Sequence, residues 1–280
     1  MAATQETLVH LLYCDESNLE ARAGEFLVYL GVAVDGTAAG PLSEAITAIR
    51  SELRVPREFR LKFNPGPEGM SHDRFIELKS RVIGVARDHG VNLLAYVVLH
   101  DIATGGPDEA RRNGINTVAY HFDCLLHRRD DCGLVLIDRF TDAGSAIEAH
   151  LAQKFSVGLV GMPYSKEMPL TRILGYHYSA IGQAHFCSLV DIITGSFRFA
   201  INAHTRKQDN LLPSARTILG SLSPLFVRDE ADGPVSELGL TFSPKIVKAD
   251  KYRGLYQELK GFLEEAGVPT AQPITAQRTY

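Results

Sequence analysis

Apolar and polar residues alternate along the chain in two rhythms, which predict strands and helices. Short runs rich in β-branched and other apolar residues favour strands, whose side chains point to opposite faces at successive positions. Predicted strands lie at residues 9–14, 25–34, 91–100, 133–140 and 172–179. Only the short segment "NLEARAG" separates the first two, which predicts a hairpin and antiparallel pairing.

Other segments repeat apolar residues every three or four positions, which is the period of a helix with one buried face. Predicted helices lie at residues 41–53, 71–89, 115–129, 143–155 and 182–204. Local signals support the second helix, because Ser71 is a good N-cap residue and Gly90 a typical stop.

The order of these elements predicts an α/β fold with a mixed five-stranded sheet. Two successive strands, a third after a helical section, and then alternating strands and helices favour a sheet flanked by helices on both sides. We expect one domain over residues 1–204, with a helical insertion at about 36–90. Residues 205–215 resemble a linker, and only one strand and one amphipathic helix are expected after it. The segment 205–280 is therefore expected to be a C-terminal extension packed on the domain.

The composition is that of a folded protein, and it narrows the expected location. Hydrophobic residues make up 45% of the chain and charged residues 22%, which is enough apolar material for a full-sized core. There is no basic start followed by an apolar stretch and no apolar run of about 18 residues, so we expect neither export nor membrane insertion. The four cysteines form no CxxC pair and indicate reduced thiols. We expect a cytoplasmic protein.

Three aspartates stand where a buried element ends or where no other charge is near. Asp15 closes the strand "HLLYCD" and shares its face with Leu11 and Tyr13. Asp138 closes the strand "LVLID" in the same way, again at the end of an apolar run. Asp191 lies in "CSLVDIITG", at the edge of the apolar stripe of its helix and with no other charged residue within five positions.

Ionised carboxylates at the edge of a core are costly unless a positive charge meets them, and several together raise one another's pKa values. A divalent cation removes both penalties. Hard oxygen ligands suit Mg²⁺ or Mn²⁺, and two such ions about 4 Å apart can promote phosphodiester hydrolysis. The pattern therefore predicts a metal site formed by Asp15, Asp138 and Asp191.

These motifs resemble those of the domain-of-unknown-function 3800 family, whose fold is similar to that of ribonuclease H. The match consists of "YCDES", "EFLVYLGVAV", "LKF", "LVLID" and "SLVDIITGSFRFA" in that order, and it covers roughly residues 9–204. Asn18 stands where the family usually has glycine, and Val190 where it has alanine. The resemblance implies a ribonuclease H-like sheet and metal coordination by the three aspartates.

The resemblance also implies roles for residues around the aspartates. Glu16 and Ser17 match the start motif, and Lys62 matches a lysine often found in the inserted section. Glu16 or Lys62 would orient water or the scissile phosphate. No glutamate matches the fourth acid of ribonuclease H, and Asp123 is the nearest candidate.

Each of these residues also has a simpler interpretation. Asp15 and Glu16 could begin a turn, and Asp138 could be a solvated strand end. Asp191 could pair with Arg198 two turns along its helix or bond to a neighbouring strand. Lys62 could be an ordinary surface lysine.

A nucleic-acid partner would have to bind a local basic patch, because the net charge of the chain is -4. The segment "RSELRVPREFRLK" provides such a patch. Two functions from different classes are therefore expected. The first is a metal-dependent phosphodiester hydrolase acting on RNA or DNA, and the alternative is a catalytically silent ribonuclease H-like module that binds nucleic acid or protein.

Overall fold

The computed structural model describes residues 7–20, 22–103, 106–139, 146–160 and 167–277. Its strands are β1 (Val9–Ser17), β2 (Phe26–Asp35), β3 (Asn92–Leu99), β4 (Cys132–Asp138), β5 (Leu159–Val160), β6 (Glu167–Met168), β7 (Ile173–Ser179) and β8 (Leu240–Ser243). Its helices are α1 (Gly36–Glu52), α2 (His72–Asp88), α3 (Gly106–Arg129), α4 (Ala146–Ser156), α5 (His185–Thr205), α6 (Leu212–Leu222) and α7 (Asp250–Glu265).

A six-stranded mixed sheet in the order β7-β4-β1-β2-β3-β8 forms the centre of the fold, and β5 and β6 form a separate two-stranded pair. Strands β1, β2 and β3 pair antiparallel, whereas β4 is parallel to β1 and β7 is parallel to β4. The α/β class and the mixed sheet flanked by helices are as expected. The expected count of five strands is wrong, because β8 from the C-terminal segment pairs with the free edge of β3.

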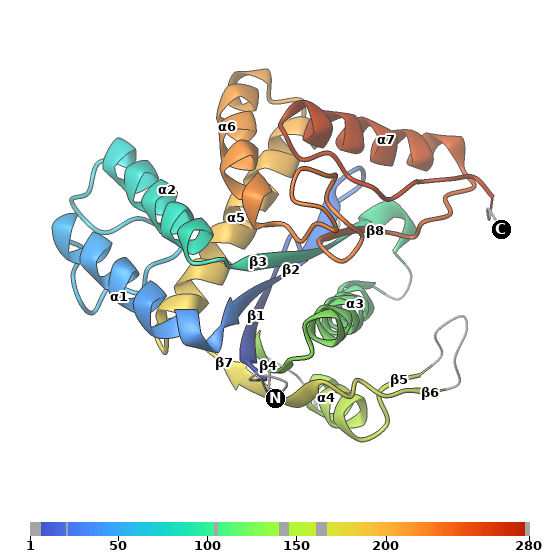
Figure 1. Cartoon of the computed structure of the whole chain (residues 1–280). Helices are drawn as coiled ribbons and strands as arrows, with labels where there is room; N and C mark the ends of the chain where they lie inside the picture. The colour runs from blue at the N-terminus through green and yellow to red at the C-terminus, as the bar shows by residue number, and fades with distance from the viewer. Residues whose placement is uncertain (1–6, 21, 104–105, 140–145, 161–166, 278–280) are drawn as a thin grey trace.

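Helices cover both faces of the sheet (Figure 1). Along β2, Val28 and Leu30 face a core formed with α1, α2, α5, α6 and α7, whereas Leu27 and Tyr29 face a second core formed with α3 and α4. The alternation follows from the two-residue period of a strand, and the uniformly apolar sequence of β2 follows from its burial on both faces.

Helix α5 packs against β1 and β2 in the first of these two cores, which we call the α5-side core, and most of its residues are buried. Among the described residues it is the one helix long and apolar enough to cross a membrane, yet 83% of its most apolar stretch is buried inside the fold. Its apolar composition is accounted for by packing against the sheet on one side and helices on the other.

The helix starts differ from the sequence prediction in three places. Helix α1 begins at Gly36 rather than at residue 41, because the Asp35 side chain accepts a hydrogen bond from the Thr37 N–H at 2.7 Å. Helix α3 begins at Gly106 rather than at residue 115. Helix α6 occupies part of the expected linker, since its apolar residues pack on α5. The predicted Ser71 cap and the stop at Gly90, with φ of 67°, are confirmed.

Tyr256 joins the C-terminal segment to the sheet. Its side chain is fully buried, and its hydroxyl donates to the Ser243 carbonyl and accepts from the Leu99 N–H at 2.9 Å. One hydroxyl of α7 thus satisfies the ends of β3 and β8 together.

Replacing Tyr256 by Phe should therefore lower the free energy of unfolding by about 1–3 kcal/mol, because it leaves two buried backbone groups without partners. Urea denaturation of the purified protein measures this change. Tyr252→Phe on the same helix is the control and should change the free energy by less than about 0.5 kcal/mol. Equal effects of the two substitutions would contradict the assigned role of Tyr256.

Candidate functional site

The parallel pairing of β1 with β4 places Asp15 beside Asp138. Cys14 pairs with Ile137, and the two aspartates are the next residues of their strands, which lie about 4.8 Å apart. Asp15 lies two residues after Tyr13, and Asp138 two residues after Leu136, so each shares the face of that neighbour. Tyr13 and Leu136 both pack in the α5-side core, so both carboxylates are on the face that α5 covers. Since β1 continues to Ser17, the interpretation of Asp15 as the beginning of a turn is wrong.

Asp191 approaches this place from α5, at the edge of the helix. The Phe63 N–H donates to Asp191 Oδ2 at 2.6 Å. The next turn of α5 has Gly195, where an added Cβ would come within 2.3 Å of the Phe63 ring. The segment before α2 therefore packs tightly on α5 and closes one side of the site.

A hollow of about 200 Å³ lies between these elements. Its lining includes Asp15, Glu16, Phe63, Asp191, Thr194 and Arg198. Asp138 does not line the hollow, but its charge reaches both other aspartates, since it raises the pKa of Asp15 and its own pKa is raised by Asp191. The structure thus brings the three predicted aspartates into one electrostatic cluster.

Burial and repulsion between carboxylates disfavour the ionised form of Asp15. Burial raises the pKa of Asp15 well above its usual range, and the carboxylates of Glu16, Asp191 and Asp138 raise it further. The opposing contribution is a hydrogen bond from the Glu16 N–H, at 2.9 Å. Burial also raises the pKa values of Asp138 and Asp191. The description of Asp138 as a fully solvated strand end therefore does not fit.

Positive charge lies beside the cluster without neutralising it directly. Lys62 is half-buried, and its charge lowers the pKa values of Asp138 and Asp191. Arg198 also lowers the pKa of Asp191 through its charge, and its buried Nε–H has no hydrogen-bond partner among the described residues. Lys62 is thus near the acids, as the sequence suggested, and the proposed Asp191–Arg198 pair is a longer-range attraction.

Two hydrogen-bond donors in the hollow have no partner among the described residues. They are the buried Thr194 hydroxyl and the buried Arg198 Nε–H, which follow Asp191 by three and seven positions on the same helix. Buried polar groups of folded proteins are nearly always hydrogen-bonded, so two unpartnered donors in one hollow indicate a place for a ligand or water.

Glu16 is held from the other face of the sheet. Arg111 of α3 donates through Nε to Glu16 Oε1 at 3.1 Å, and both side chains are about nine-tenths buried. Sequence reasoning missed Arg111, because this residue precedes the helix predicted at residues 115–129. The spacing of seven residues pointed to Arg198 only as an ion-pair partner of Asp191, and not as a donor of the site.

Asp123 lies far from the other acids. It accepts a hydrogen bond from the Arg172 N–H at 2.8 Å, just before β7, whereas Asp138 pairs with Ser179 at the other end of that strand. Seven strand residues span about 20 Å. The suggestion that Asp123 is a fourth acid of the site is therefore wrong.

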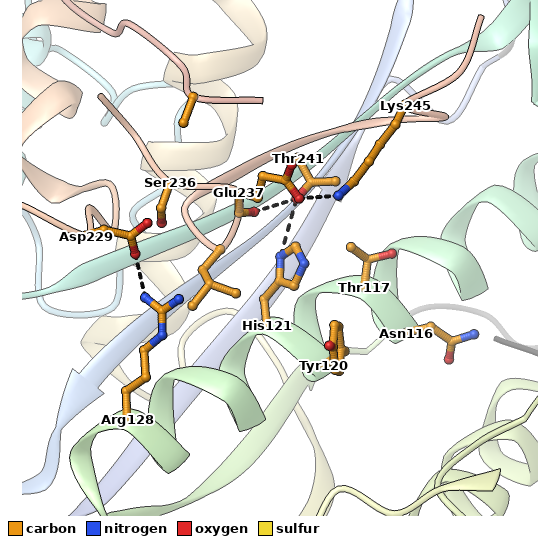
Figure 2. Close-up of a pocket in the computed structure, with 12 residues that line it drawn as sticks. Asn116, Thr117, Tyr120, His121, Arg128, Asp229, Ser236, Glu237, Thr241 and Lys245 are labelled. Atoms are coloured by element: carbon orange, nitrogen blue, oxygen red, sulfur yellow. Dashed lines mark hydrogen bonds and ion pairs between the residues drawn. The ribbon is translucent and has the colours of Figure 1, made fainter. Parts of the chain in front are cut away.

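A separate hollow of about 540 Å³ lies on the α3 side of the sheet (Figure 2). Its charged groups are already matched, since Arg128 pairs with Asp229 at 2.5 Å and Lys245 with Glu237. His121 at its wall is deeply buried, which lowers its pKa to about 4 and keeps it neutral. This hollow offers no uncompensated charge, so the acidic cluster is the better candidate site.

No known protein family, curated protein or solved structure matches this chain. Among the described residues, no group of three or more His, Cys, Asp or Glu side chains converges closely enough to hold a metal ion in the positions they occupy. Metal binding by the three aspartates stays a prediction.

The pKa values of the cluster predict a stability that depends on pH. The pKa of Asp15 in the folded protein lies above its unfolded value of about 3.9, so the folded state binds the proton more tightly. Stability in chelator should therefore fall as pH rises from the unfolded through the folded pKa, with Asp138 and Asp191 contributing in the same direction.

Asp15→Asn removes the buried charge and should raise the thermal unfolding midpoint near neutral pH, with less gain near pH 4. Scanning calorimetry at both pH values in chelator measures this. Asp88→Asn, at an exposed position of α2, should give no such gain. A lower midpoint for Asp15→Asn near neutral pH would show that the carboxylate stabilises the fold.

Proposed function

We propose that this protein is a metal-dependent phosphodiester hydrolase, a nuclease acting on RNA or DNA. The observation that carries the proposal is the hollow beside the acidic cluster. It combines buried, mutually repelling carboxylates with two unpartnered donors, Thr194 and Arg198. A cation would neutralise the carboxylates, and a phosphate oxygen would accept hydrogen bonds from the two donors.

The sheet supports the finer proposal of a ribonuclease H-like fold. Three antiparallel strands are followed by β4 and β7, both parallel to β1, which is the order that the family resemblance implies. The acids lie at the carboxyl ends of β1 and β4, where ligands bind in many open α/β sheets.

The donor set fits a hard divalent cation in chemistry and charge. Carboxylate oxygens suit Mg²⁺ and Mn²⁺, and burial raises the pKa values of all three aspartates, which a bound cation would offset. Asp15, Asp138 and Asp191 would hold the ions after side-chain rotation. When bound, the ions would supply Lewis-acid polarisation of the phosphodiester and an activated water.

The other residues of the site would position the substrate. The Thr194 hydroxyl and the Arg198 guanidinium would donate to non-bridging phosphate oxygens, and Lys62 would add positive charge to the same group. Glu16, fixed by Arg111, would orient the attacking water from the opposite side.

A catalytically silent module that binds nucleic acid or protein is the second candidate. It is favoured by the lack of a converged metal-binding group among the residues that the structure describes. Such a module would keep its affinity for its partner when an aspartate of the cluster is replaced.

Wild-type protein should cleave RNA or DNA in Mn²⁺ or Mg²⁺ and not in chelator, and Asp15→Asn or Asp191→Asn should remove detectable cleavage. A gel assay on labelled oligonucleotides measures this, and Asp88→Asn is the control that should retain activity. Calorimetric titration with Mn²⁺ tests the ligands directly, with Asp138→Asn as the variant. Absence of Mn²⁺ uptake by the wild type would refute the proposal and favour the silent module.

Thr194→Val separates a ligand-binding role from a structural one, because it keeps the shape of the side chain and removes a hydroxyl with no partner among the described residues. The variant should be as stable as the wild type or more stable, while the rate falls by about 10²–10³-fold. Thr241→Val, whose hydroxyl bonds the Glu237 carbonyl, should lose stability instead. A Thr194→Val variant with full activity would remove this residue from the site.

A further inference from the structure

A third hollow, of about 500 Å³, lies beside the acidic cluster on the α5 side of the sheet. Its walls come from α1, from the segment 57–61 and from the first turn of α5. Residues that matter for its chemistry are Arg57, Glu58, Arg60, Gly182, His185 and Ser188.

The charge of this hollow is mainly positive. Arg57 and Arg60 are exposed, and neither forms an ion pair with an acid among the described residues. Glu58 is the acid in the lining. A pair of arginines without acidic partners differs from the other hollow, where each cation has its own carboxylate.

The segment that presents these arginines is fixed from within. Arg50 of α1 is nine-tenths buried and donates to the carbonyls of Pro56 and Phe59, at 3.0 and 2.8 Å. On the other wall, Gly182 has φ of 92°, and an added Cβ there would lie 3.2 Å from the Arg60 side chain. The aliphatic part of Arg60 therefore packs on this loop, which holds the guanidinium near the hollow.

The N-terminus of α5 adds to the positive potential. Its N-cap residue, Ala184, lacks a side-chain oxygen, so no cap side chain accepts the first N–H groups of this 21-residue helix. Unsatisfied N–H groups and the helix dipole favour an anion at such a place. His185 in the same turn is hydrogen-bonded to Thr47 at 2.9 Å, which joins α5 to α1 across the hollow.

The hollow and the acidic cluster are consecutive along the same two segments. Seven residues of α5 separate Ala184 from Asp191, a distance of about 10 Å along a helix. On the facing segment, Arg60 is followed by Lys62 and by Phe63, whose N–H bonds Asp191.

We propose that this hollow binds a backbone phosphate of a nucleic-acid strand whose scissile phosphate lies at the acidic cluster. The inference rests on the proposed function, because the acidic cluster defines the other end of the strand. It identifies the substrate as a polymer rather than a small phosphoester. Arg57 and Arg60 are its positioning residues.

The test is binding of a fluorescently labelled single-stranded oligonucleotide, measured by anisotropy in chelator so that cleavage plays no part. Arg57→Ala/Arg60→Ala should weaken binding at least about tenfold, and the slope of log affinity against log salt should fall by about 0.7, the value for one lost phosphate contact on a single strand. Circular dichroism should show an unchanged fold, because both side chains are exposed.

The control is Lys248→Ala/Lys251→Ala, which removes two positive charges from exposed positions near and on α7. It should leave affinity within about twofold of the wild type, since exposed charges away from the strand contribute little at physiological salt. Equal weakening by both double variants would overturn the proposal, as would a wild-type chain that binds no oligonucleotide.

Calorimetry with inorganic phosphate separates the strand from a free anion. A loss of phosphate binding in Arg57→Ala/Arg60→Ala, with oligonucleotide affinity unchanged, would assign the hollow to a small anion and overturn the strand proposal. The measurement is independent of catalysis. If the protein lacks nuclease activity, weakened oligonucleotide binding by Arg57→Ala/Arg60→Ala still supports the phosphate site. If cleavage is normal and the variant binds as tightly as the wild type, the phosphate site is refuted while the proposed nuclease function stands.

Discussion

The close approach of three half-buried aspartates is the constraint around which this structure is organised. The parallel register of β1 and β4 sets Asp15 beside Asp138, and the packing of α5 brings Asp191 to the same place. The apolar cores on both faces hold these elements, so the acids cannot separate without loss of packing. A fold that retains uncompensated charge at such a cost is typical of a functional site, where perturbed pKa values cluster.

The two-residue period of β1 places the side chains of the site on both faces of the sheet. Asp15 faces α5, whereas Glu16 faces α3 and is fixed there by Arg111. The helical section between β2 and β3 completes the α5 side, because it supplies Lys62 and the N–H of Phe63 that bonds Asp191. This section therefore belongs to the candidate site as much as the strands do.

Periodicity and local charge were sufficient to find the parts of the site that lie on regular elements. The two-residue period placed Asp15 and Asp138 on one face, and the isolation of Asp191 in an apolar helix marked it. Contacts between segments far apart in the sequence have no local pattern that predicts them. Arg111 is 95 residues from Glu16 in the sequence. Strand β8 pairs with the edge of β3, whose backbone groups would otherwise lack partners. Helix α6 was missed because its short apolar pattern begins next to a proline.

Helix α5 sets the distances within the site and its surroundings. Its N-terminus lies at the arginine hollow, and Asp191, Thr194 and Arg198 follow at spacings of three and four residues on one face. A helix rises by a fixed amount per residue, so the helix N-terminus, a carboxylate and two donors are held at set intervals along one rigid axis. Gly195 allows the Phe63 ring to pack directly on this axis. Burial of α5 on nearly all sides prevents it from sliding, and the geometry of the site therefore depends on the core rather than on the loops around it.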